Sequence, residues 1–201
     1  MSASSAKTWQ AISPSPRRRA TIRGVDGLAC SITLNTRFDA EQRRRYQDPR
    51  TIQRLLREAK TIAIVGLSTE KAKASNMVAS YLQDEGYRIV PVHPKASEIL
   101  GEKCYPTVAD IPFPVDVVDI FRPANEVPEI VEQAIANGAR AVWMQLRIVH
   151  LEAADRAIEA GLIAIVDRCI KMEHGRYGGQ LHWAGMNTEV VTSRKRSVRE
   201  S

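Results

Sequence analysis

Short apolar runs alternate with amphipathic stretches through the middle of the chain. Five runs have the length and the aliphatic, β-branched composition of buried strands, and they cover residues 61–66, 87–92, 115–121, 139–146 and 162–166. The stretches between them carry apolar residues at helical spacing, and the predicted helices cover residues 75–85, 127–137 and 151–160. Strands that alternate with helices in this way form βαβ units with right-handed crossovers. The pattern therefore predicts an α/β fold with a five-stranded parallel sheet.

Residues that begin or end helices refine this prediction. Asp48 followed by Pro49 is typical of an N-cap and a first helical position, so we expect the ordered domain to begin with a helix there. Ser75 is expected to cap the helix after the first strand. Between the second and third strands the pattern predicts only a helical turn near residues 108–111. Beyond Lys171 the chain is polar and rich in glycine, and no further element is predicted.

The positive charge of the chain is concentrated at its two ends. The net charge is +6, with +5 in residues 1–25 and +3 in residues 192–201, so the intervening part carries −2. Residues 1–35 are rich in Ser, Arg and Pro and are expected to be a disordered extension, either a transit peptide or the product of a translation start placed too early. Residues 191–201 are expected to be a basic tail, and residues 40–190 the folded domain.

Composition limits the class of protein further. Three scattered cysteines without CxxC spacing favour a reducing compartment and argue against a disulfide framework or a zinc site. Aromatic residues make up only 5% of the chain, which disfavours specific binding of single-stranded nucleic acid. No apolar run is long enough to span a membrane. We expect a cytoplasmic protein, or a mitochondrial one if the N-terminal extension is a transit peptide.

The ligand is expected at one edge of the sheet. Helices on both faces of a parallel sheet give a three-layer, Rossmann-like fold, in which ligands bind beyond the carboxyl ends of the strands. Gly66 ends the first strand and leads to a helix N-terminus, which attracts phosphate. The dinucleotide fingerprint GxGxxG is absent, and Lys95 follows the second strand where an NAD site needs an acid. A phosphate-rich ligand such as NADP or coenzyme A (CoA) fits this edge better than NAD.

Five blocks together resemble a known family: Gly66-Leu-Ser68, Pro91-Val-His-Pro-Lys95, Val115-Asp-Val-Val-Asp-Ile-Phe-Arg122, Val142-Trp-Met-Gln145 and Asp167-Arg-Cys-Ile-Lys171. They are similar to the stand-alone CoA-binding proteins, whose domain is similar to the N-terminal domain of the succinyl-CoA ligase alpha subunit. The resemblance covers residues 40–190 and implies CoA, or acyl-CoA, across the strand ends. His93 and Arg147 depart from it, since the family tends to have Asn and Gly there.

The resemblance also implies which residues contact the ligand. Gly66, Ser68 and Ser75 would meet the pyrophosphate. The nucleotide portion would lie between the second and third strand ends, which carry Val92, Pro94, Lys95, Phe121 and Arg122. Leu67, His93 and Gln145 complete the implied binding set.

We find no convincing catalytic or metal-binding constellation in the sequence. Asp116 and Asp119 are expected to make structural hydrogen bonds. Cys169 is the one candidate redox thiol, because Arg168 and Lys171 would favour its thiolate. The sequence thus predicts non-catalytic binding of CoA or acyl-CoA. The alternatives are an NADP-linked oxidoreductase, a CoA-linked thiol redox partner acting through Cys169, and an interaction module whose basic tails contact RNA or membrane.

Overall fold

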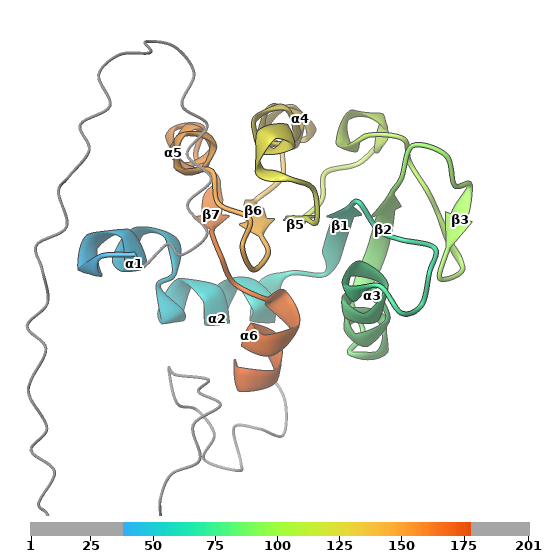
Figure 1. Ribbon diagram of the computed structural model, residues 1–201, viewed down its shortest axis with the longest axis horizontal. Helices are drawn as coiled ribbons and strands as arrows, with labels where there is room; N and C mark the ends of the chain where they lie inside the picture. The colour runs from blue at the N-terminus through green and yellow to red at the C-terminus, as the bar shows by residue number, and fades with distance from the viewer. Residues whose placement is uncertain (1–37, 178–201) are drawn as a thin grey trace, which may run out of the picture. The chain divides into compact units, whose positions relative to one another are not determined.

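A parallel five-stranded sheet forms the centre of the computed structural model, which describes residues 38–177 (Figure 1). The predictions for residues 1–35 and 191–201 lie outside these residues. The strand order is β2-β1-β5-β6-β7. The strands are β1 (Thr61–Val65), β2 (Arg88–Val92), β5 (Val117–Ile120), β6 (Ala141–Met144) and β7 (Ile163–Ile165). The predicted fold class and all five predicted strands are confirmed.

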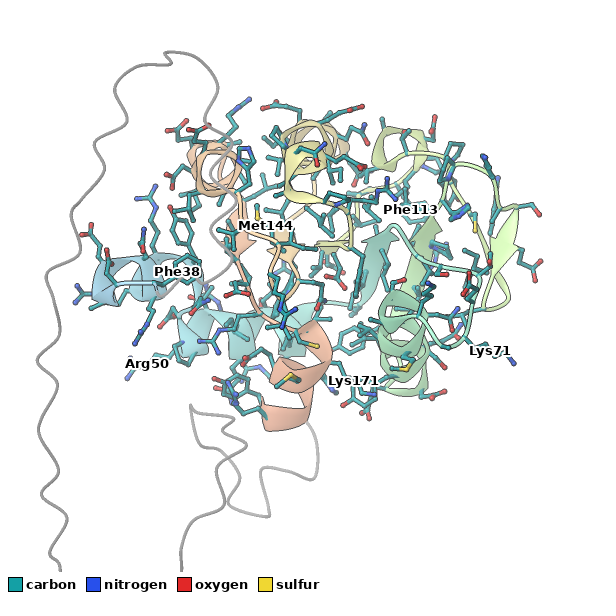
Figure 2. All side chains as sticks on the ribbon, in the orientation of Figure 1. Phe38, Arg50, Lys71, Phe113, Met144 and Lys171 are labelled. Carbon is teal, nitrogen blue, oxygen red and sulfur yellow. The ribbon has the colours of Figure 1, made fainter. Side chains whose placement is uncertain are left out.

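Helices cover both faces of the sheet and make the predicted three layers (Figure 1). One face carries α2 (Pro49–Glu58), α3 (Ala74–Asp84) and α6 (Ile170–Tyr177). The other carries the 3₁₀ turns η1 (Val108–Asp110) and η2 (Ala124–Glu126), together with α4 (Val127–Asn137) and α5 (Leu151–Glu159). Successive strand residues point to opposite faces. Trp143 therefore packs under α2, α3 and α6, whereas Met144 packs under α4 and α5 (Figure 2).

Two helices were not predicted from the sequence. α1 (Ala40–Tyr46) begins the described domain before Asp48, and Asp39 and Gln42 form a capping box at its start. Its only buried residue is Tyr46, so it lacks the apolar stripe by which helices are recognised. α6 was missed for a related reason. Its buried face includes Glu173 and His174, and a polar buried face leaves no apolar periodicity.

Other segments contact both outer strands of the sheet near their carboxyl ends. Beside β2, Tyr105 donates its amide to Pro91 O at 2.9 Å and accepts from His93 N at 2.9 Å. Tyr105 follows a short hairpin that the sequence did not predict, formed by β3 (Glu98–Ile99) and β4 (Glu102–Lys103). Just after β7, the Gln47 side chain donates to Val166 O at 2.8 Å. These contacts occupy backbone groups that an edge strand would otherwise expose.

Candidate functional site

The carboxyl ends of the central strands form a continuous edge, as the sequence predicts. Backbone hydrogen bonds continue past the strand ends: Gly66 N donates to Val92 O at 3.1 Å, and Phe121 N donates to Val65 O at 2.9 Å. β1 lies between β2 and β5, so the chain reverses its direction of travel across the sheet at β1. Ligands of open parallel sheets bind at such a switch point.

Gly66 brings the chain very close to its neighbours at this edge. Its φ of +85° is a conformation that favours glycine. A Cβ placed on it would lie 2.7 Å from Arg122 Cδ and 3.2 Å from Phe121 O. The absence of a side chain therefore lets the backbone after β1 lie against the end of β5. This close approach suits a loop that presents backbone amides to a phosphate.

The loop from Gly66 to α3 is held by the first turn of that helix. Ser68 N donates to Ser75 Oγ at 3.1 Å, and Asn76 Nδ2 donates to Ser68 O at 2.8 Å. The prediction that Ser75 caps α3 is wrong, because Lys73 occupies the N-cap and Ser75 already lies inside the helix. Leu67 is fully buried in the core, so only its backbone is at the edge.

The block after β2 divides into a buried part and an exposed part. Val92 is buried in the core, and His93 Nδ1 accepts hydrogen bonds from Lys95 N at 3.1 Å and Ala96 N at 2.9 Å. His93 therefore caps a turn, which is a structural role for a residue that departs from the family. Pro94 and Lys95 are exposed. Lys95 makes no ion pair with any residue from 38 to 177.

Arg122 lies beside Gly66 and carries a compensated charge. Its guanidinium donates to both carboxylate oxygens of Glu126, at 2.7 and 2.9 Å. A bidentate pair of this kind fixes the guanidinium plane. The neighbouring Phe121 is half-buried against the α3 face of the core.

Beneath the edge lies a buried polar pair that the sequence identifies only in part. Gln145 is 4% exposed, and its Nε2 donates to both carboxyl oxygens of Asp119, at 2.8 and 3.0 Å. Asp119 is fully buried on the α3 and α6 face of β5, and burial raises its pKa to about 8. The expectation of a structural hydrogen bond for Asp119 is confirmed. Its neutral state at pH 7 has no signal in the sequence, because it depends on burial.

Cys169 lies at the same edge, but the expected activation of its thiol is wrong. Burial raises the pKa of Cys169, although the amides of Met172 and Lys171 donate to its sulfur and the Lys171 charge favours the thiolate. Both expected cations also contact other groups, and burial outweighs the effect of Lys171 on the thiol. Arg168 pairs with Glu173 at 3.3 Å, and Lys171 Nζ lies 4.9 Å from the centre of the Tyr81 ring.

Arg147 occupies a conformation that explains why glycine suits its position. Its φ is +67°, and its amide donates to Asp167 Oδ1 at 2.7 Å. A non-glycine residue in this region is strained by roughly 1–2 kcal/mol. The substitution therefore costs backbone strain, and the exposed side chain points away from the core.

The chain's family follows from comparison with known proteins. Residues 60–175 match the sequence profile of a family described as a CoA binding domain. The chain belongs to this family. The matched region runs from the start of β1 into α6 and so contains the whole sheet.

Relatives of this CoA-binding domain include stand-alone proteins and parts of ligases. Protein YneT of Bacillus subtilis, described as uncharacterized, is 37% identical over 123 residues, which cover 61% of this chain and 91% of that one. Acetate–CoA ligase (ADP-forming) II of Archaeoglobus fulgidus is 31% identical over 112 residues, 55% of this chain but only 17% of the ligase. A solved structure of a hypothetical protein from Pyrococcus horikoshii has a TM-score of 0.62 and 44% identity, covering 64% of this chain and 91% of that one.

Neither a membrane-spanning helix nor a metal-binding cluster of side chains occurs within residues 38–177. No helix there has the length and apolar character needed to cross a membrane. The same residues contain no group of three or more His, Cys, Asp or Glu side chains that could hold a metal ion.

Proposed function

We propose that this CoA-binding domain binds coenzyme A or acyl-CoA across the carboxyl edge of its sheet, without performing chemistry on it. The observation that carries the proposal is the juxtaposition, at the switch point, of the Gly66 loop with the exposed Lys95, which forms no ion pair within residues 38–177. The loop suits a pyrophosphate, and the lysine suits the ribose 3′-phosphate that distinguishes CoA from most nucleotides.

The electrostatics of the edge support an anionic ligand. Lys71 projects outward from the loop after β1 (Figure 2) and, like Lys95, forms no ion pair within residues 38–177. Lys73 is only loosely paired with Glu70, at 3.9 Å. Flexible exposed lysines attract phosphates without imposing a fixed geometry.

The two enzymatic alternatives have less support. An NADP-linked oxidoreductase would use the same phosphate contacts, and titration with NADP distinguishes it from a CoA binder. A redox step through Cys169 requires a thiolate, which its raised pKa disfavours at neutral pH. We therefore assign no redox step to Cys169.

Lys95 offers a direct test of the proposed ligand. Replacing it with alanine should weaken CoA binding about tenfold to a hundredfold, because a charge-assisted hydrogen bond contributes roughly 1.5–3 kcal/mol. Dephospho-CoA, which lacks the 3′-phosphate, should bind wild-type protein more weakly than CoA does and should be nearly insensitive to Lys95→Ala. Isothermal titration of both ligands into both proteins gives the coupling energy of the pair.

A matched control removes a charge beside β7, at the opposite side of the sheet from β2 and Lys95. Arg43→Ala on α1 deletes another exposed cation that has no ion pair in the described domain, and it should leave the affinity for CoA unchanged. If Lys95→Ala and the loss of the phosphate weaken binding additively, Lys95 does not contact the 3′-phosphate. If Lys95→Ala binds CoA as well as wild type, the proposed placement of the nucleotide is wrong.

A further inference from the structure

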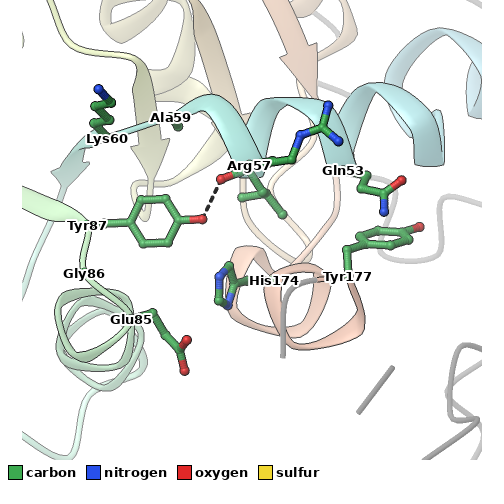
Figure 3. A pocket seen from close by; sticks show the side chains of 10 residues that line it. Gln53, Arg57, Ala59, Lys60, Glu85, Gly86, Tyr87, His174 and Tyr177 are labelled. Atoms are coloured by element: carbon green, nitrogen blue, oxygen red, sulfur yellow. Dashed lines mark hydrogen bonds between the residues drawn. The ribbon is translucent and has the colours of Figure 1, made fainter. Parts of the chain in front are cut away.

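A pocket lies at the opposite edge of the sheet from the proposed CoA site, where β1 and β2 begin. Its volume is about 420 Å³, and small-molecule sites span about 300–1,000 Å³. Side chains from the end of α2, from the turn between α3 and β2, and from α6 line it (Figure 3). The proposed CoA site lies at the other ends of these strands, so the pocket is not part of it.

The floor of the pocket is apolar and aromatic. Leu56, Ala59 and Tyr87 are buried there. The Tyr87 hydroxyl donates to Leu56 O at 2.6 Å, which holds the ring in place (Figure 3). The ring of His174 meets the Tyr87 ring edge to face, with centroids 5.4 Å apart. A planar apolar group can lie against such a floor.

His174 adds a polar ring to this floor. It is 8% exposed, and burial lowers its pKa. Its Nδ1 lies 2.9 Å from the hydroxyl of Tyr81. Contacts with Tyr81 and Tyr87 therefore hold the imidazole ring against the floor.

The rim of the pocket supplies positive charge. Arg57 and Lys60 are exposed there, and neither pairs with a carboxylate within the described domain. Glu85 is the one acid in the lining. With two cations and one acid, the charged side chains that line the pocket carry a net positive charge.

We propose that the pocket binds a small carboxylic acid with a planar apolar body. Arg57 and Lys60 supply the positive charge at the rim that attracts the carboxylate, and the apolar body lies on Tyr87 and Leu56. Carboxylates and cationic donors make charge-assisted hydrogen bonds, which are stronger than neutral ones. This site is independent of the proposed CoA site and goes beyond it.

Phenylacetate and its neutral isostere phenylacetamide test this assignment on the full chain. Phenylacetate should shift the imidazole nitrogens of His174 and the amide of Tyr87 in ¹⁵N NMR spectra, and phenylacetamide should bind about tenfold more weakly or worse. The double variant R57Q/K60Q should lose phenylacetate affinity by a similar factor. R54Q, on the same helix but outside the pocket lining, should keep it.

Three results would overturn the proposal. They are equal binding of acid and amide, equal binding by R57Q/K60Q and R54Q, and spectral shifts centred on Gly66 and Lys95 in place of His174. A CoA titration of R57Q/K60Q distinguishes the two sites. The double variant should bind CoA with the same affinity as wild type, whether or not the pocket binds phenylacetate. If phenylacetate does not bind in the pocket, the proposed CoA site is unaffected. If CoA does not bind at the strand ends, the proposal for the pocket is likewise unaffected.

Discussion

The wild-type protein is expected to lose stability as pH rises from 5 to 8, and replacing Asp119 with asparagine is expected to abolish this loss. The folded-state pKa of Asp119 is raised to about 8, well above the ordinary 3.8, because the carboxyl is buried with only an amide partner. Between these values the native state holds a proton that the unfolded chain releases. The free energy of unfolding therefore falls with rising pH, by about 1.4 kcal/mol per pH unit for one such group.

Denaturant unfolding at several pH values measures this slope. Across pH 5 to 8 the contribution of Asp119 amounts to roughly 3.5 kcal/mol, a large part of a typical domain stability. An asparagine side chain has no proton to lose, so Asp119→Asn should give a flatter pH dependence by that amount even if the variant is less stable at every pH. An unchanged slope in the variant would show that Asp119 is ionised in the folded protein.

Asp116, just before the same strand, is the matched control for this experiment. Although burial alone would raise its pKa, hydrogen bonds from the amides of Lys60 and Thr61 lower it below the ordinary value. A lowered folded-state pKa stabilises the protein above the unfolded pKa, and this stabilisation is lost as pH falls through the folded value. Asp116→Asn should therefore change stability at low pH and leave the slope between pH 5 and 8 intact.

Gly66→Ala is expected to reduce both stability and CoA affinity. The new Cβ would meet Arg122 Cδ at 2.7 Å, so the arginine must move and its pair with Glu126 is disturbed. The contact with Phe121 O at 3.2 Å involves backbone and cannot relax as easily. We expect a loss of about 2 kcal/mol or more in unfolding free energy, and at least about a tenfold loss of CoA affinity because the phosphate loop is displaced.

Gly161→Ala separates backbone strain from the clash. Gly161 has a similar φ of +89°, but no atom lies within 4 Å of its added Cβ. This variant should lose only about 1 kcal/mol, the cost of the left-handed conformation, and should bind CoA normally. If both variants behave alike in unfolding and in isothermal titration, the close approach at Gly66 has no functional role.

The alternation of apolar runs was sufficient to predict the sheet, because each strand is buried on both faces and is therefore almost wholly apolar. Helices whose buried side is polar, or that bury very few residues, could not be predicted in this way. α6 packs Glu173 between Arg168 and Arg176, at 3.3 and 2.9 Å, and a buried ion-pair network looks like a solvated surface in sequence. For α1, the capping box of Asp39 and Gln42 is visible in the sequence and predicts a helix start. It is not detected when helices are recognised by an apolar stripe alone.

The candidate site was predictable to the level of the strand ends but not of individual contacts. Gly66, Lys95 and Gln145 were placed at one edge by the rule that parallel strands end together. Whether a polar side chain at that edge is free depends on partners distant in sequence. Ser75 is bonded to the loop amide of Ser68, and Gln145 to Asp119, a residue 26 positions away. Tertiary contacts of this kind cannot be read from spacing.

The most direct test of the central claim is the melting temperature of the full chain with CoA and with NADP at equal concentrations. A ligand selective for the folded state stabilises it by about 2.7 kcal/mol at a hundred times its Kd, and the melting temperature rises accordingly. The proposed site predicts a clear rise in melting temperature with CoA and a smaller rise with NADP. A larger rise with NADP than with CoA, or no rise with CoA at any concentration, would contradict it.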